Sequence, residues 1–315
     1  IYMGDWSSDV CSSDLAAADL RETRPRIVSD PSYVRSVAAS PDLASVAIEY
    51  RGEIVTLHAQ DATVRNLSQS SGANDRSPAW SADGAQLAWF SDLSGEYSLY
   101  IRAANAVGAA RRIELQGAGF YEDLKWSPDG RFLSYRDNSQ SLYVLDLQSG
   151  QAHRIAQEPA YTPAVTMTHN WAPDSQWLAY TINEHGLVQT TYLYSLRAQR
   201  SFQVTGALVD AGEPVFDPDG QHLYVAASID AGPVRDWFTQ SRAGTKITRN
   251  LYAISLGNDA GRDRNVAAFP LDPESTTDRT IPLPGASGAI RSVQVGRTGE
   301  IYYLAAASEI GRAHV

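Results

Sequence analysis

Seven charged or titratable residues stand at matching places, each within five residues before a tight turn that recurs along the sequence. They are Arg35, Arg76, Glu122, Asp123, His169, Glu213 and Arg291. Side chains of both signs at one end of neighbouring strands can bind either terminus of a peptide, because each terminus finds an opposite charge there. The alternative is a rim of solvated turn residues, and the sequence leaves both interpretations open.

The sequence patterns do not supply a catalytic set. The Gly-Ala-Ser-Gly run at 285–288 lacks the spacing of a Gly-x-Ser-x-Gly nucleophile elbow. No His-Glu-x-x-His or phosphate-binding glycine loop occurs, and Asp259, Asp263 and Asp272 lack calcium-loop spacing. As the only histidine expected on an inner strand, His169 is interpreted as packed or hydrogen-bonded rather than as a base. We therefore expect no catalytic residue, no metal site and no cofactor in this chain.

Composition and charge exclude several classes of protein. The chain has 315 residues, 43% of them apolar and 20% charged, which is ordinary for a globular protein. Its formal charge of −10 argues against nucleic acid as a partner. No apolar run approaches the roughly 18 residues that a membrane span needs.

The two ends of the chain can be encoded by related nucleotide sequences. One possible coding sequence for Asp9 to Leu15 has a reverse complement that, preceded by one G, encodes Glu309 to Val315. The same string resembles a common sequencing adapter. We therefore expect residues 1–15 and 309–315 to be translated adapter and not native protein, which assigns the single cysteine, Cys11, to the adapter. The native part is then expected to be a fragment.

A turn motif repeats along the rest of the chain. Its first residues are Ser40, Ser81, Ser127, Ala172, Asp217 and Gly296, and the spacing between the first five is 41 to 46 residues. Three of the copies end in Asp-Gly. In such a turn, Pro presets the first corner, Asp accepts hydrogen bonds from the local backbone, and Gly takes the positive φ at the end.

Four strand patterns follow one another in each period. An inner strand ends in the motif, a second and a third strand form a hairpin, and a short outer strand completes the unit. Four-stranded units of about 45 residues are typical of β-propeller blades. The sequence therefore predicts an all-β fold, a β-propeller of four-stranded antiparallel blades, with about six blades visible of an expected seven. A β-sandwich would not repeat its turn chemistry, and a β-solenoid has shorter coils.

Parity along the inner strands predicts which side chains face a neighbouring blade. Residues one and three before the turn are large, as in Trp80, Trp126 and Trp171, and are expected to pack between blades. Residues two and four before it are small or polar, as in Lys125 and Asp123, and are expected nearer the central channel.

Several segments resemble the second propeller of the tricorn protease family, whose members carry two propellers, a PDZ domain and a serine peptidase domain. The resemblance covers about 33–304. The segments that carry it are 72–81 with 88–97, 123–130 with 142–147, 177–181 with 192–196, 214–220 with 224–230, and 247–252.

This resemblance implies a function. The chain would be the non-catalytic propeller of a serine oligopeptidase, guiding or gating peptides towards a C-terminal peptidase domain. Its partners would be oligopeptides, its own PDZ and peptidase domains and, in a homo-oligomer, other copies of itself. We expect a cytoplasmic location, with a periplasmic one as alternative, and no peptidase activity of the chain alone. The alternatives are a stand-alone binding propeller, like the periplasmic Tol-system component, and the propeller of a prolyl-oligopeptidase-type hydrolase.

The expected organisation has five parts. They are adapter at 1–15, a linker from an upstream domain at 16–32, the propeller at 33–308 and truncated in its last blade, an insertion within it at 229–288, and adapter at 309–315.

Overall fold

A computed structural model describes residues 31–159, 167–183, 188–206, 209–228, 248–256 and 279–306. Within 285–291, the burial of Gly288 and Ile290 alone is described. The expected adapter segments, Asp259, Asp263 and Asp272 lie outside these residues. Almost all of the described secondary structure is β, and one 3₁₀ turn at Pro31–Tyr33 precedes the first strand.

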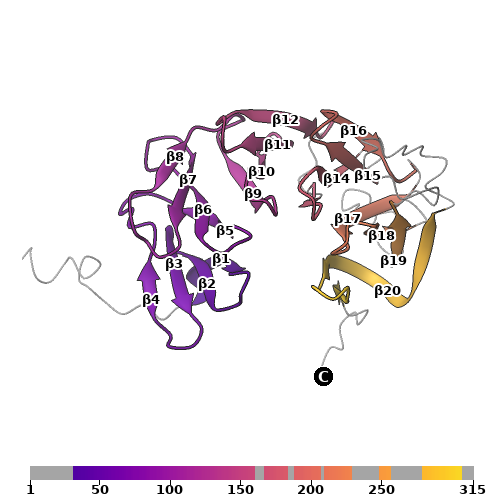
Figure 1. Ribbon diagram of the computed structural model, residues 1–315, viewed down its shortest axis with the longest axis horizontal. Coiled ribbons are helices and arrows are strands. Elements are labelled where there is room, and N and C mark those ends of the chain that lie inside the picture. Colours follow the sequence, from indigo (N-terminus) through magenta and orange to yellow (C-terminus); the bar gives the residue numbers. More distant parts are fainter. Residues whose placement is uncertain are drawn as a thin grey trace, which may run out of the picture. The chain divides into compact units, whose positions relative to one another are not determined.

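The first three sheets each contain four consecutive strands, with each strand antiparallel to the next. Blade 1 consists of β1 (Val34–Ala39), β2 (Ser45–Tyr50), β3 (Glu53–His58) and β4 (Val64–Asn66). Blade 2 consists of β5 (Arg76–Trp80), β6 (Gln86–Ser91), β7 (Ser98–Ala103) and β8 (Arg111–Ile113). Blade 3 consists of β9 (Tyr121–Trp126), β10 (Phe132–Asp137), β11 (Ser141–Asp146) and β12 (Ala152–Gln157). The colours of Figure 1 show that each blade is one continuous stretch of the chain.

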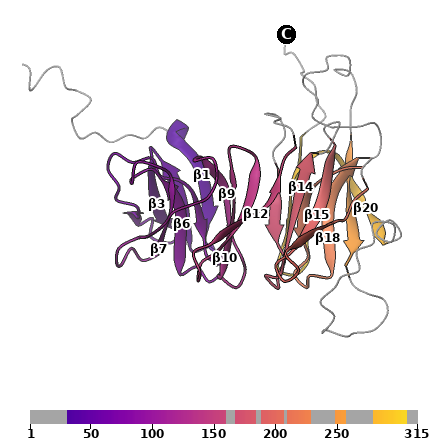
Figure 2. The same ribbon diagram turned by 90° about the horizontal axis from the view of Figure 1, so that it is seen from above.

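The later sheets follow the same plan. Blade 4 consists of β13 (His169–Trp171), β14 (Trp177–Asn183), β15 (Gln189–Ser195) and β16 (Arg200–Gln203). Blade 5 consists of β17 (Asp210–Phe216), β18 (His222–Ser228), β19 (Arg249–Ser255) and the first part of β20 (Thr280–Val295). The second part of β20 pairs with β21 (Ile301–Ala306), so these two strands are the described part of blade 6. Figure 2 shows β14 and β15 beside each other from a second direction.

The predicted β-propeller is therefore confirmed. The fold repeats because the turn repeats: Ser40, Ser81 and Ser127 each donate a hydrogen bond of 2.6 Å to the Asp two residues later. The Asp in turn accepts from the backbone N–H two residues beyond it, as Asp83 does from Ala85 at 3.0 Å. These bonds close each inner hairpin at the same place in its blade.

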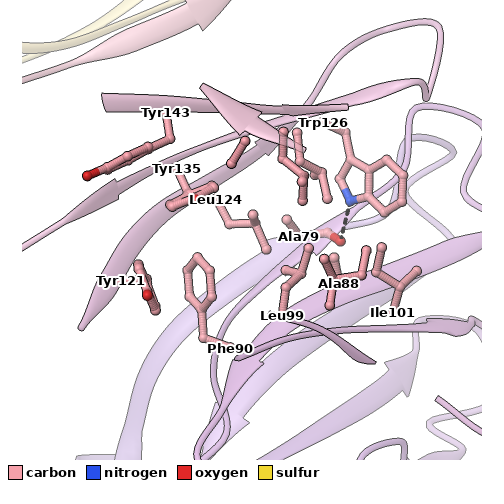
Figure 3. Close-up of a cluster of buried hydrophobic side chains, with 14 residues drawn as sticks. Ala79, Ala88, Phe90, Leu99, Ile101, Tyr121, Leu124, Trp126, Tyr135 and Tyr143 are labelled. Atoms are coloured by element: carbon pink, nitrogen blue, oxygen red, sulfur yellow. Dashed lines mark hydrogen bonds between the residues drawn. The ribbon is translucent and has the colours of Figure 1, made fainter. Parts of the chain in front are cut away.

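Apolar clusters fill the seams between consecutive blades. The cluster between blades 2 and 3 is the one in Figure 3, where Phe90 meets Tyr121 and Tyr135. Further clusters join blades 1 and 2, 3 and 4, 4 and 5, and 5 and 6. Since no blade can bury both of its faces alone, stability depends on this stacking.

The inner-strand tryptophans behave as parity predicts. Trp126 is 9% exposed, and its Nε1 donates to the carbonyl of Ala79 in the preceding blade at 3.0 Å (Figure 3). Trp80 repeats this bond one blade earlier, to the carbonyl of Ala38 at 3.0 Å. Each tryptophan thus contributes apolar area and satisfies a carbonyl of the neighbouring inner strand.

Candidate functional site

A backbone irregularity recurs on the inner strands. Ser77, Asp123 and Glu213 each stand four residues before a turn and have φ of 54°, 52° and 54°. At these three places the pairing with the second strand shifts its register. Positive φ is uncommon for residues other than glycine, and a bulge of this kind redirects the side chains beside it. The inner strands of blades 2, 3 and 5 therefore change direction at the same level.

Charges of alternating sign follow one another beside these bulges. Arg76 of blade 2 approaches Glu122 of blade 3, with 3.8 Å between Nη2 and Oε1. Its guanidinium also lies over the ring of Phe120, at 3.9 Å from the centroid. Arg136 on β10 contacts the other oxygen of Glu122 at 3.7 Å. Charged side chains of two blades thus form one continuous row.

Asp123 is the centre of this row, which we call the inner-strand network. Its carboxylate lies 3.6 Å from Nε of Arg136, 3.6 Å from Nζ of Lys125 and 3.1 Å from Nδ1 of His169. Burial alone would raise the pKa of the Asp123 carboxyl, but the hydrogen bond with His169 and the positive charges of Lys125 and Arg136 outweigh burial and hold the pKa well below its usual range. Asp123 is therefore ionised at neutral pH, and 27% of its side chain is exposed.

His169 anchors the network in blade 4. Its side chain is fully buried, and burial lowers its pKa, an effect that the neighbouring Asp123 opposes only in part. The imidazole is therefore neutral at pH 7 and acts as a packed polar group, as the sequence indicated. Lys125 crosses the same seam and donates to the His169 carbonyl at 2.5 Å and to Oδ1 of Asn170 at 3.1 Å.

The structure brings four of the seven candidate residues together. Arg76, Glu122, Asp123 and His169 belong to the inner-strand network. Glu213 occupies the equivalent bulge of blade 5. Arg35 is exposed on β1, and none of the ion pairs among the described residues includes it. Arg291 lies on β20, and its side chain is outside the described ones. The role of the seven as a substrate channel stays a prediction.

Sequence reasoning missed two charged residues on second strands. Arg136 joins both carboxylates of the network, and its side chain is only 11% exposed. Glu49 is 4% exposed and accepts from the backbone N–H of Ser77 at 3.0 Å and from Ser36 Oγ at 2.7 Å. Both stand nine residues after the start of their turn, where blade 2 has Phe90. A charge at a place that another blade fills with an apolar residue was the available signal.

A second buried network joins blades 4 and 5. Arg249 is 1% exposed, and its Nη2 donates to Asp210 and to Gln189 at 2.9 Å each. Asp210 also accepts from the backbone N–H of Gln189 at 3.0 Å. Because these groups are buried and paired across the two blades, their role is structural.

The inner-strand network carries partly exposed charges of both signs. Glu122, with 46% of its side chain exposed, and Asp123 offer carboxylates to a positive group, whereas Lys125, at 32%, offers a positive charge. Among the described residues, no group of three or more His, Cys, Asp or Glu could hold a metal ion. The described part of the chain also contains no helix that is long and apolar enough to cross a membrane.

Comparison with known families supports the fold. The sequence model of one protein family, the tricorn protease second β-propeller domain, matches residues 34–309. Among solved structures, a crystal structure of the tricorn protease superimposes with a TM-score of 0.66 at 18% identity, covering 86% of this chain and 27% of that one. At that identity the superposition shows a common fold.

A tricorn protease homolog and an uncharacterized peptidase are among the curated relatives. A tricorn protease homolog of Saccharolobus solfataricus is 21% identical over 267 residues, which cover 85% of this chain and 23% of the relative. The uncharacterized peptidase YuxL of Bacillus subtilis is 29% identical over 160 residues, covering 48% of this chain and 22% of YuxL. The chain thus spans less than a quarter of the length of either relative.

Proposed function

Because this chain belongs to the family of tricorn protease second β-propeller domains, we propose that it guides peptide substrates towards the peptidase domain of a tricorn-type serine peptidase. The chain itself would be non-catalytic. Its PDZ and peptidase domains would belong to the remaining length of the parent protein, which we propose to be a cytoplasmic homo-oligomer.

One observation carries this proposal. The inner-strand network presents partly exposed charges of both signs along neighbouring inner strands, from Arg76 in blade 2 to Lys125 in blade 3. A passing peptide has an ammonium at one end, a carboxylate at the other and side chains of either sign. Partly exposed charges bind such groups weakly, by roughly 1 kcal/mol or less each, which favours passage over retention. A tight, specific site would need groups that are buried and fully paired with the ligand.

The test uses the full-length parent enzyme with Glu122→Gln and Arg76→Gln, singly and together. Both substitutions remove charge from the network and leave a polar side chain, of the same shape at position 122 and shorter at position 76. We expect kcat/KM for peptides of ten or more residues to fall roughly twofold to fivefold, from about 0.5–1 kcal/mol of lost interaction, while kcat/KM for dipeptide and tripeptide substrates stays unchanged.

The matched control is Glu114→Gln. Glu114 directly follows the outer strand β8, its side chain is 83% exposed, and its ion-pair partner is Arg112 on the same edge. This substitution makes the same chemical change far from the inner strands, so both classes of substrate should keep their rates. An equal loss for long and short peptides in the network variants, or no loss for either, would remove the basis of the guiding role.

A further inference from the structure

A cavity of about 360 Å³ lies at the seam between blades 1 and 2, beside the tight turns. Blade 1 contributes Ser45 and Thr56 to its lining, and blade 2 contributes Trp80. The volume corresponds to about a dozen water molecules and falls within the usual range for small-molecule sites, roughly 300–1,000 Å³. The cavity does not share its lining with the inner-strand network, so the inference below is independent of the proposed function.

The cavity exists because blade 1 has small polar residues where blades 3 and 4 have large apolar ones. The place of Ser45, five residues after the turn begins, is taken by Phe132 in blade 3 and Trp177 in blade 4. In blade 3, Phe132 stacks on Trp171 of the next blade, with centroids 6.2 Å apart. The Phe132 ring thus fills the space beside Trp171. The equivalent space beside Trp80 stays open, because Ser45 is too small to fill it.

A second position shows the same contrast. Thr56 pairs with Ala47 on the neighbouring strand, and the equivalent partner of Ala179 in blade 4 is Leu193. Trp177 and Leu193 line the corresponding cavity between blades 4 and 5, which measures about 70 Å³. Two residues of blade 1 therefore leave open space that their counterparts in blade 4 fill.

The charged groups of the cavity are held in place by bonds within the protein. Asp42 accepts from Ser40 Oγ at 2.6 Å, and Asp61 accepts from the backbone N–H of Thr63 at 3.0 Å. Hydrogen bonds from Thr63 lower the pKa of Asp61 to about 2, and the bond from Ser40 lowers the pKa of Asp42. Both carboxylates are therefore ionised at neutral pH.

The two basic side chains of the lining are fixed in the same way. His58 Nδ1 lies 2.9 Å from Asp61 Oδ1, and Arg65 donates from Nη1 to the carbonyl of Asn105 in blade 2 at 2.8 Å. Charges of both signs thus line the cavity, each with at least one protein partner already. The two carboxylates would repel an anionic ligand. Their attraction for a cationic ligand is reduced by Arg65 and by the hydrogen bonds that both carboxylates already accept.

We propose that this cavity binds a neutral polyhydroxylated ring of the size of a pyranose sugar. Each hydroxyl of such a ring can donate to a carboxylate and accept from a guanidinium, so lining groups of both signs are used. The apolar C–H face would pack on the indole of Trp80, whose orientation is fixed by its bond to the Ala38 carbonyl at 3.0 Å. Ser45 and Thr56 provide the room and further hydroxyl groups.

The test measures transfer of magnetisation from the protein to methyl pyranosides by ligand-detected NMR. The probes are methyl glucoside, galactoside and mannoside, compared with arginine amide as a cation and acetate as an anion. We expect saturable binding of at least one pyranoside in the millimolar range and none of the two ions. Ser45→Trp should abolish this binding because it places in blade 1 the residue that blade 4 has at that position.

Two further variants make the test specific. Gln86→Trp adds the same ring at the equivalent position of blade 2, where Gln86 is exposed, and should leave binding unchanged. Thr56→Leu introduces the residue of blade 4 and should weaken binding at least threefold, which keeps the test valid if Ser45→Trp fails to fold. The proposal is wrong if no pyranoside binds, if binding survives in both cavity-filling variants, or if arginine amide or acetate binds in a manner that Thr56→Leu removes.

Discussion

The inner-strand network can be tested by Asp123→Asn. This substitution removes one negative charge that approaches Arg136, Lys125 and His169 at 3.6, 3.6 and 3.1 Å. It keeps the shape of the side chain, and Asn tolerates the φ of 52° at this bulge at least as well as Asp. The change in stability therefore reports the loss of the charge rather than backbone strain.

The expected loss of unfolding free energy is about 2–3 kcal/mol. Breaking a fully buried ion pair costs roughly 3–5 kcal/mol, and breaking an exposed one costs roughly 0–1 kcal/mol. Asp123 lies between these cases because its side chain is 27% exposed, whereas that of Arg136 is 11% exposed. The variant leaves Arg136 nearly buried beside a neutral amide, which places the cost nearer to the buried case.

The pH dependence of this difference has a definite sign. The folded-state pKa of Asp123 is held below the unfolded value of about 3.9. The stabilisation is therefore present above about pH 4 and is lost as the pH falls through the lower, folded-state pKa. We expect the difference between the wild type and the variant to be constant from neutral pH down to about pH 5 and to shrink in stronger acid.

The assay is urea unfolding followed by tryptophan fluorescence and circular dichroism. Ser77→Asn is the control, because Ser77 has the same bulge with φ of 54° and carries no charge. It should change the free energy of unfolding by less than about 0.5 kcal/mol. A loss below that limit for Asp123→Asn, or an equal loss for Ser77→Asn, would refute the electrostatic role of the network.

Three further predictions concern stability. Burial raises the pKa of Glu158 to about 7. Its contribution to the unfolding free energy is therefore full below the unfolded pKa and falls by about 3 kcal/mol as the pH rises from about 4.5 to 7. Glu158→Gln should remove this dependence of the unfolding free energy on pH, measured by urea unfolding, and an unchanged dependence would contradict the assignment. Trp126→Phe removes the bond to the Ala79 carbonyl and should cost about 2 kcal/mol, read from the urea midpoint; a neutral result would mean that the seam relaxes. Gly117 has φ of +130°, and a Cβ there would lie 2.7 Å from Asp137 Oδ2, so Gly117→Ala should lower the thermal midpoint by several degrees, about 2 kcal/mol, whereas an unchanged midpoint would show that Asp137 can move.

The strands were predictable because they follow a repeated local signal. Ser81-Ala82-Asp83-Gly84 and its copies determine where each inner hairpin turns. The seam positions of Trp80 and Trp126 followed from parity alone, since side chains alternate between the two faces of a strand. Local turn chemistry and period-two alternation thus account for the fold.

The network and the cavity depend on contacts between blades, which no local pattern contains. Arg136 and Asp123 meet because β10 pairs with β9 through a bulge, and the sequence around Asp123 carries no glycine that would indicate a positive φ. The cavity beside Trp80 is present because the small side chain of Ser45 leaves space there. Aligning the blades with one another would have marked Ser45 as the small residue of its position, and that signal was present in the sequence.

The most direct test of the guiding role maps where a peptide touches the propeller. Peptides of ten or more residues with a photoreactive group at successive positions would be cross-linked to the full-length parent enzyme, and the linked residues identified by mass spectrometry. The proposed function predicts cross-links on the inner strands, at 121–126 and 169–171, that decrease in Glu122→Gln. Cross-links confined to the outer strands β4, β8, β12 and β16, or none on the propeller, would contradict it.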